Sequence, residues 1–573
     1  MPVGRSCALI ISGAVLATSV SAQIPRSPRG TPPASAAPRI LVANPHSFTT
    51  QDSATSIVIA EGLRQRIDRL ASAQFRVLTR KEMNEALTQF GYPVDAILNN
   101  APARNLAQSL NARVMVYTTL THQGDRFIAT ARVAGLTEEA GNVVVKTQAA
   151  GQSPAEFGAS LADGFAPLFK VWNEARGCVD NIRVSADKAT QAAKKAVQAV
   201  PNHGLANYCL GQLAIEKGTK ADSAQAMKFF ETSTKGDPLS LASWTQLAAG
   251  YEAAGDTTQT IAALRQMLLI APTNQPLREL AFKKFLAYGQ PEIAEQVADE
   301  GLQIDPINTD LFELRANARI FRENYSGALD DLEQIVALDS TRADTTFYLK
   351  YIVTASQKPD TVRLVRWVSR GVRQYPGNKT ILSQAAGSYS MVGLSDSIAG
   401  VLNLLLPMDT AGAVGLALQE AKNQQDAKQA ARSLPFIDFA AAHGDATGRE
   451  SAAGLLLNAT LPLLQPPAQD FKAAATGLRR VVQLANPQGR YAPIANHFLG
   501  LSLVNLISQT DPQAEKQKSC DLARSVESMT SEAGTALANA TGYQQQADAR
   551  ARLLQYLGGL KPRTASMLKA YCK

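Results

Sequence analysis

The chain has 573 residues, which exceeds the roughly 250–300 residues at which single hydrophobic cores stop growing, so several domains or a repeat array are expected. Hydrophobic residues make up 45% of the chain and aromatic residues 6%, and Ala is abundant, which favours packed helices over a β-sandwich. The formal charge of +8 comes without a run of Lys or Arg, so a nucleic-acid partner is not indicated.

Residues 1–22 predict a signal peptide. One Arg precedes an apolar stretch from Ala8 to Ala17, and Val20-Ser21-Ala22 is a small-residue cleavage site. The alternative is an amino-terminal membrane anchor, but the apolar stretch is shorter than the ~20 residues that span a bilayer. Residues 23–38 are rich in Pro, Ser and Ala and predict an extended linker. We therefore expect export to the bacterial periplasm or cell envelope, with no transmembrane segment in the mature chain.

Residues 39–180 predict a domain of strands and helices. A strand ends at Pro45, and the next helix places Ile59, Leu63 and Ile67 on its apolar face and Arg64 on the opposite face. The other elements are expected in the order of a short strand at 75–80, helices at 81–90 and 105–111, three strands between 113 and 151, and one helix at 155–175. This order predicts an α+β domain in which helices cover a mixed sheet.

Five segments of this domain are "ILVANP", "IAEGLRQRIDRL", "FRVLTRKEMNEAL", "ARNLAQSLNARVMVYTTL" and "ARVAGLTEEAGNVV". In these segments the domain resembles the small envelope domains of the TolB amino-terminal and CsgG/FlgO-like type. Such domains belong to envelope assemblies and have no known catalytic residues, so the resemblance implies docking. The lipidated cysteine and long membrane hairpins of the pore-forming relatives are not found in this sequence, which argues against pore formation.

Four cysteines follow the predicted signal peptide, namely Cys178, Cys209, Cys520 and Cys572. An even number in an oxidising compartment allows two disulfides and three pairings, of which Cys178 with Cys209 and Cys520 with Cys572 closes the smallest loops. Buried, reduced thiols are the alternative. No CxxC pair occurs, so neither zinc binding nor thioredoxin-like chemistry is supported.

A sequence marker recurs between residues 181 and 408. The marker residues are Pro201, Pro238, Pro272, Pro306, Ser340 and Pro376, at spacings of 37, 34, 34, 34 and 36 residues. A spacing near 34 residues with a Pro after the second helix is typical of tetratricopeptide repeats.

Two further sets of residues carry the resemblance to the tetratricopeptide family. Residues twelve positions before the markers are mostly small, as close contact between paired helices requires: Ala189, Ala226, Thr260, Ala294, Ala328 and Leu364. One repeat also has the family's residue types at Trp244, Leu247, Ala248 and Tyr251. The resemblance implies an all-α, right-handed superhelical solenoid with an inner groove. Residues 409–573 keep helical periodicity without the 34-residue spacing, so they predict degenerate repeats, with a possible break at Gln465–Asp470.

In this repeat class the first helix of each pair lines the concave surface. Counting from the markers gives the candidate partner-binding residues Thr245, Ala249, Glu252, Glu279, Lys283, Leu286, Glu313, Asn317, Ile320, Phe347 and Tyr351. Phe347 and Tyr351 are four residues apart and would form an aromatic ledge for a peptide. The alternative is that both rings pack against a neighbouring repeat. The family's groove for a terminal carboxylate needs Lys and Asn where this chain has Thr245 and Ala249, so that binding mode is not expected.

No motif for catalysis is found. A nucleophile elbow, HExxH, a phosphate-binding loop and a dinucleotide-binding turn are missing from the sequence, and the five His residues are scattered. His443-Gly444-Asp445 is explained by a turn with a helix-capping Asp. We therefore predict a non-enzymatic scaffold without cofactor that binds protein partners. The alternatives are a glycan-binding module, for which three Trp residues are few, and an enzyme whose site leaves no local motif.

Overall fold

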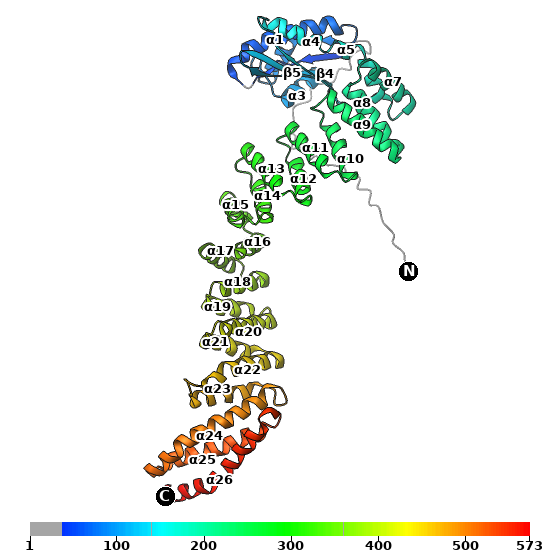
Figure 1. Ribbon diagram of the computed structural model, residues 1–573. Helices are drawn as coiled ribbons and strands as arrows, with labels where there is room; N and C mark the ends of the chain where they lie inside the picture. The colour runs from blue at the N-terminus through cyan, green and yellow to red at the C-terminus, as the bar shows by residue number, and fades with distance from the viewer. Residues whose placement is uncertain (1–36, 48, 139, 359, 573) are drawn as a thin grey trace. The chain divides into compact units, whose positions relative to one another are not determined.

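The structure is a computed structural model that describes residues 37–572 except Phe48, Glu139 and Pro359 (Figure 1). The predicted signal peptide and most of the predicted linker lie outside the described residues. The chain divides into two compact units, of which the first ends at Ala271 and the second begins at Pro272. This division falls inside the predicted repeat region.

The first unit contains a mixed sheet in the order β3-β1-β4-β5-β6, with β2 paired to β4. Strand β1 is parallel to β3 and β4, whereas β4, β5 and β6 are antiparallel neighbours. The strands are β1 Arg39–Val42, β2 His46–Ser47, β3 Arg76–Val77, β4 Ala112–Gln123, β5 Arg126–Gly135 and β6 Asn142–Thr147. Gly124 makes the turn from β4 to β5 with a φ of 63°, a left-handed conformation that favours glycine. The predicted mixed sheet is confirmed.

Helices cover both faces of this sheet (Figure 1). Neighbouring residues of β1 point to opposite faces, as the two-residue period of a strand requires. Ile40 packs with α1 and α4, and Leu41 packs with α2 and α3. The helices are α1 Ser53–Ala71, α2 Arg80–Gln89, α3 Asn100–Ser109 and α4 Pro154–Asp163.

Two expectations for this region are wrong. The single helix expected at 155–175 is divided into α4, α5 (Ala166–Lys170) and the beginning of α6 (Trp172–Asn181). Pro167 lies at the start of α5, where its missing N–H cannot continue α4. Arg64 is buried and does not point to solvent, because Nε donates to the Val42 carbonyl at 3.2 Å and Nη2 to Asn44 Oδ1 at 2.6 Å.

Antiparallel helices form the rest of both units. The first unit continues with α7 Ala186–Ala199, α8 Gly204–Lys217, α9 Lys220–Gly236, α10 Leu241–Ala253 and α11 Thr257–Ile270. The second unit contains α12 Gln275–Ala287, α13 Pro291–Ile304, α14 Thr309–Phe321, α15 Tyr325–Leu338, α16 Thr345–Gln357, α17 Thr361–Gln374, α18 Lys379–Met391, α19 Ser395–Leu405, α20 Thr410–Asp426, α21 Ala430–His443, α22 Ala446–Thr460, α23 Phe471–Leu484, α24 Tyr491–Gln517, α25 Cys520–Asn539 and α26 Ala547–Tyr571.

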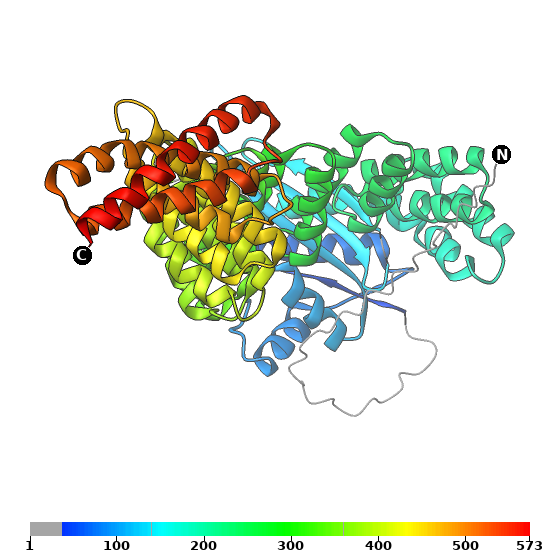
Figure 2. The ribbon, with the colours of Figure 1, turned by 90° about the horizontal axis from the view of Figure 1, so that it is seen from below.

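The predicted helical repeat is confirmed as a tetratricopeptide-like solenoid. The six positions that lie twelve residues before the sequence markers are all at most 1% exposed. Ala or Thr at five of these positions lets the paired helices approach closely. A single core runs through the second unit from Ala316 to Leu560, so the expected break at Gln465–Asp470 does not divide it. Helices α24, α25 and α26 lie side by side at the end of this unit (Figure 2). No helix within residues 37–572 is long and apolar enough to cross a membrane.

Candidate functional site: the open face of the first helices

Five first helices of the repeats begin in the same way. Each of α10, α12, α14, α16 and α18 follows a residue whose side-chain oxygen accepts a hydrogen bond from a backbone N–H of the first turn. These caps are Ser240, Asn274, Asn308, Asp344 and Asn378, at spacings of 34, 34, 36 and 34 residues. The caps therefore give a structural register for comparing the helices.

Three positions of this register form an open face on each first helix. Residues five, nine and twelve positions after the cap are exposed or half-buried in every one of the five helices. In the first unit, α10 presents Thr245, Ala249 and Glu252. In the second unit the open face consists of Glu279, Lys283, Leu286, Glu313, Asn317, Ile320, Leu349, Val353, Ser356, Ser383, Gly387 and Ser390.

The candidate residues of α10, α12 and α14 are exposed or half-buried, whereas the two candidates of α16 are not. Phe347 and Tyr351 are buried, at 7% and 0% exposure, so they form no ledge on the open face. The 36-residue spacing before α16 includes a short 3₁₀ turn at Ser340–Arg342 and shifts the register by two residues. Leu349 and Val353 occupy the open positions instead, and Val353 is 45% exposed. Leu349 and Val353 lie as far before the marker Pro376 as Thr245 and Ala249 lie before Pro272. Counting back from Pro376 would therefore have identified them, whereas adding 34 residues to Glu313 did not.

Phe347 and Tyr351 belong to an aromatic cluster, as the packing alternative expected. The ring of Trp367 from α17 lies 4.7 Å from Tyr351 and 5.5 Å from Phe347, measured between centroids. The Tyr351 hydroxyl donates to Glu333 Oε1 at 2.6 Å, and the indole N–H of Trp367 donates to the same oxygen at 3.0 Å. Burial and the neighbouring Glu333 both raise the pKa of Tyr351, so its hydroxyl stays protonated and this contact persists.

Glu313 on the open face has two basic partners. Its carboxylate accepts from Arg342 at 2.7 Å and from Lys350 at 2.5 Å. These three side chains line a small cavity of about 120 Å³, and Phe347 forms part of its wall. The structure thus brings two predicted site residues to one cavity, although only Glu313 reaches the open face.

The α/β part of the first unit is joined to its repeats by a site that sequence analysis did not identify. Asp237, directly before the marker Pro238, is fully buried and accepts from Arg132 of β5 and from the backbone N–H of Gly141 at 2.6 Å. Asn142 Oδ1 also accepts from the backbone N–H of Gly204 at 2.9 Å. An acidic residue directly before a repeat marker is expected to be an exposed turn residue. The sequence therefore does not indicate that Asp237 connects the sheet to the repeats.

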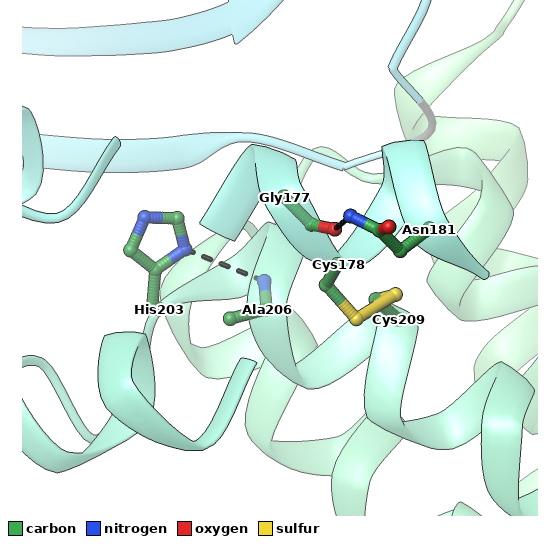
Figure 3. The surroundings of a disulfide bond; sticks show 6 residues. All are labelled: Gly177, Cys178, Asn181, His203, Ala206 and Cys209. Atoms are coloured by element: carbon green, nitrogen blue, oxygen red, sulfur yellow. Dashed lines mark hydrogen bonds between the residues drawn. A yellow bond between two sulfur atoms is a disulfide. The ribbon is translucent and has the colours of Figure 1, made fainter. Parts of the chain in front are cut away.

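A disulfide strengthens the same junction (Figure 3). Cys178 of α6 is bonded to Cys209 of α8, with their Cα atoms 6.3 Å apart, inside a core that also contains Ala140. The second bridge joins Cys520 at the start of α25 to Cys572 after α26. Both bridges follow the local pairing, so the reduced-thiol alternative does not hold in this structure.

The histidines have structural partners. His203 accepts the N–H of Ala206 at the start of α8 (Figure 3), and burial lowers the pKa of His203 to about 4. His122 lies 2.8 Å from the carboxylate of Asp52. Asp445 caps α22 through the N–H of Gly448, as the turn explanation of His443-Gly444-Asp445 expects. Within the described part of the chain, no three His, Cys, Asp or Glu side chains form a group that could hold a metal ion.

No family model matches the chain, and no curated protein matches it. The chain is similar to several solved structures. The match to the structure of Naa15/Naa10 bound to HypK-THB covers 70% of this chain and 68% of the other, at 13% identity and a TM-score of 0.35. A tetratricopeptide repeat protein from Parabacteroides merdae matches over 44% of this chain and 97% of its own, at 16% identity and a TM-score of 0.24. YrrB, described as a TPR protein with an unusual peptide-binding site, matches over 34% and 97%, at 13% identity and a TM-score of 0.24.

Proposed function

We propose that this chain is an exported, non-enzymatic scaffold that binds protein or peptide partners along the open face of its first helices, as part of a cell-envelope assembly. The observation that carries the proposal is the open face itself. Four successive first helices of the second unit leave the same three positions unburied, while residues three positions after each cap are buried. A helical repeat with one regular solvent-facing row has the form of a surface that holds an extended or helical peptide.

The chemistry of the open face changes along the second unit. Helices α12 and α14 contribute the charged residues Glu279, Lys283 and Glu313 beside Leu286 and Ile320. The open positions of α16 carry no charge and include Leu349 and the exposed Val353. A matching partner has charged residues at one end of the bound segment and an apolar anchor at the other. The apolar anchor supplies most of the affinity, because buried apolar contacts dominate the energy of such interfaces.

Export and envelope assembly rest on separate observations. Disulfides form and persist in oxidising compartments, and the chain carries two bridges. The resemblance of residues 39–180 to TolB-like and CsgG/FlgO-like domains implies docking to envelope components. In this proposal the α/β part attaches the protein to its assembly, and the repeats hold the client.

A glycan-binding role is less well supported, because none of the three tryptophan rings is fully available for stacking on sugars. Trp172 and Trp367 are buried, at 4% and 5% exposure. Trp244 is half-buried, and its indole N–H donates to the Pro238 carbonyl at 2.9 Å.

Site-specific photo-crosslinking tests the proposal. The crosslinking amino acid is placed at Val353 on the open face, and at Val362 on α17 as a matched control, since Val362 is also exposed, at 78%. We expect one discrete protein to be captured from envelope extract at Val353 and not at Val362. Lys283→Glu should weaken the capture, while Lys81→Glu on α2 should not. Equal capture from both valines, or no effect of Lys283→Glu, would contradict binding along the open face.

A further inference from the structure

A second cavity lies in the first unit. It has a volume of about 240 Å³ and is bounded by the sheet, α3 and the repeats. The lining residues are Asn100, Arg104, Met115, Tyr117, Arg132, Ala134, Gly135, Leu136, Leu239 and Ile270. Two arginines and no Asp or Glu line it, so its walls are rich in hydrogen-bond donors.

One of the two arginines has no carboxylate partner among the residues that the structure describes. Arg132 donates through Nε and Nη2 to the carboxylate of Asp237, which balances its charge. Arg104 donates through Nη2 to the Leu136 carbonyl, and no carboxylate within the described residues pairs with it. A carbonyl balances no charge, so Arg104 places one positive charge at the cavity.

Tyr117 adds a neutral donor. Burial raises the pKa of its phenol, so the hydroxyl stays protonated. A protonated phenol has one O–H to donate. A positive guanidinium and a phenol on neighbouring walls match the two oxygens of a carboxylate.

Apolar side chains form the remainder of the cavity. Met115 and Leu136 are buried beside it, and Leu239 is 41% exposed at its edge. Since a water occupies roughly 30 Å³ of liquid, the volume corresponds to about eight waters. This space admits a compact aliphatic group together with the carboxylate.

We propose that this cavity binds a carboxylate carried by a compact aliphatic group. A phosphate dianion fits less well, because Arg132 is already paired with Asp237 and only Arg104 has free charge. The same chemistry has two sources: a small aliphatic carboxylic acid, or the carboxyl terminus of a peptide that ends in an aliphatic residue. The site is distinct from the open face, so it adds a ligand to the α/β part of the scaffold.

Titration of the full chain with matched probes tests the site. The probes are isocaproate and its amide, and the tripeptide acetyl-Gly-Gly-Leu as free acid and as amide, followed by calorimetry and saturation-transfer NMR. We expect an acid to bind with a dissociation constant on the order of 1 mM, as its size allows, and the matching amide not to bind. Binding of isocaproate identifies a small acid as the ligand, and binding of the tripeptide acid alone identifies a peptide terminus.

Two pairs of variants separate the charge from effects on folding. Arg104→Gln should weaken binding of the acid by roughly tenfold or more, since it removes a charged hydrogen bond, whereas Arg113→Gln at an exposed position of β4 should not. Leu239→Glu should abolish binding, because the new carboxylate repels the carboxylate of the ligand. Leu239→Gln should preserve binding, because Gln has the shape of Glu without its charge. The proposal is overturned if acid and amide bind alike, if no acid binds, or if Arg104→Gln and Leu239→Glu leave the affinity unchanged.

Discussion

Asp237 receives the guanidinium of Arg132 through two donors, Nε at 3.0 Å and Nη2 at 2.8 Å, with the aspartate fully buried. Arg132 belongs to β5, and Asp237 ends the helix pair α8–α9, so this pair ties the sheet to the repeats of the first unit. The N–H of Gly141 and the Cys178–Cys209 bridge add a second and a third connection at the same junction. The α/β part and its adjoining repeats are therefore held together within one compact unit.

Asp237→Ala should destabilise the first unit by about 3 kcal/mol, because it leaves the half-buried Arg132 and the Gly141 N–H without their acceptor. Urea unfolding measures the loss, and hydrogen exchange should show lower protection in β5 and β6. Asp305→Ala is the matched control, since Asp305 occupies the same place before Pro306 but is exposed. The control should cost less than about 1 kcal/mol. An equal decrease in the free energy of unfolding for both variants would show that the contacts of Asp237 with Arg132 and Gly141 do not stabilise the first unit.

The comparison of Asp237 with Asp305 shows what the sequence could and could not predict. Marker spacing and small residues identified the helical repeat, because each repeat buries the same positions against its neighbours. The structural role of Asp237 depends on Arg132 of β5, which lies 105 residues earlier in the chain. Arg64 gives the same lesson, because its burial requires Val42 and Asn44 as partners, and helical periodicity alone places it in solvent.

For the open face, the prediction failed at one helix and for a local reason. The residue types expected of the repeat were recognised correctly, but two additional residues before α16 moved its register. Adding 34 to Glu313 therefore selected Phe347, which is buried, in place of Leu349. Because a helix turns 100° per residue, a shift of two residues moves a side chain from the open face into the core.

Tyr351→Ala and Val353→Ala should differ strongly in stability. Tyr351 is fully buried against Trp367 and bonded to Glu333, so its truncation should cost about 3–5 kcal/mol in the second unit. Val353→Ala should change the free energy of unfolding by less than about 1 kcal/mol, because nearly half of the side chain is exposed. Urea denaturation of both variants checks the assignment. Similar costs would place Val353 in the core and contradict the register given by the helix caps.

The two disulfides should differ in their sensitivity to reductant. Cys178 and Cys209 are at most 1% exposed, whereas Cys520 and Cys572 are half-buried. A thiolate must reach a sulfur atom to attack it, so Cys520–Cys572 should be reduced first in the folded protein. Brief treatment with dithiothreitol, alkylation and mass spectrometry of the peptides give the order. Labelling of Cys178 before Cys572 would contradict this order.

Removing the buried bridge should also destabilise the first unit. The double variant Cys178→Ala and Cys209→Ala opens a loop with a sequence separation of 31 residues, and a loss of roughly 3 kcal/mol is expected. The matched control is the same double substitution at Cys520 and Cys572, which should leave the unfolding of the first unit unchanged. Calorimetry distinguishes the two, because the first pair of substitutions should lower the Tm of the unit that contains the sheet.

His203 should make the first unit sensitive to mild acid. Burial lowers the pKa of His203 from 6.5 to about 4 in the folded protein. Between these two values the unfolded chain binds a proton that the folded chain does not, so the free energy of unfolding decreases as the pH falls. The total loss is about 3 kcal/mol by pH 4, and the contribution of the neutral imidazole is complete above pH 6.5.

His203→Asn tests this assignment directly. Asn preserves a side-chain acceptor at the start of α8, where Asn is a favoured cap, and it removes the titrating ring. The free energy of unfolding should therefore fall less between pH 6.5 and pH 4, by up to the ~3 kcal/mol assigned to His203. His443→Asn at an exposed position is the control and should retain the slope of the unmodified chain. An unchanged slope in His203→Asn would mean that a group other than His203 binds the proton on unfolding.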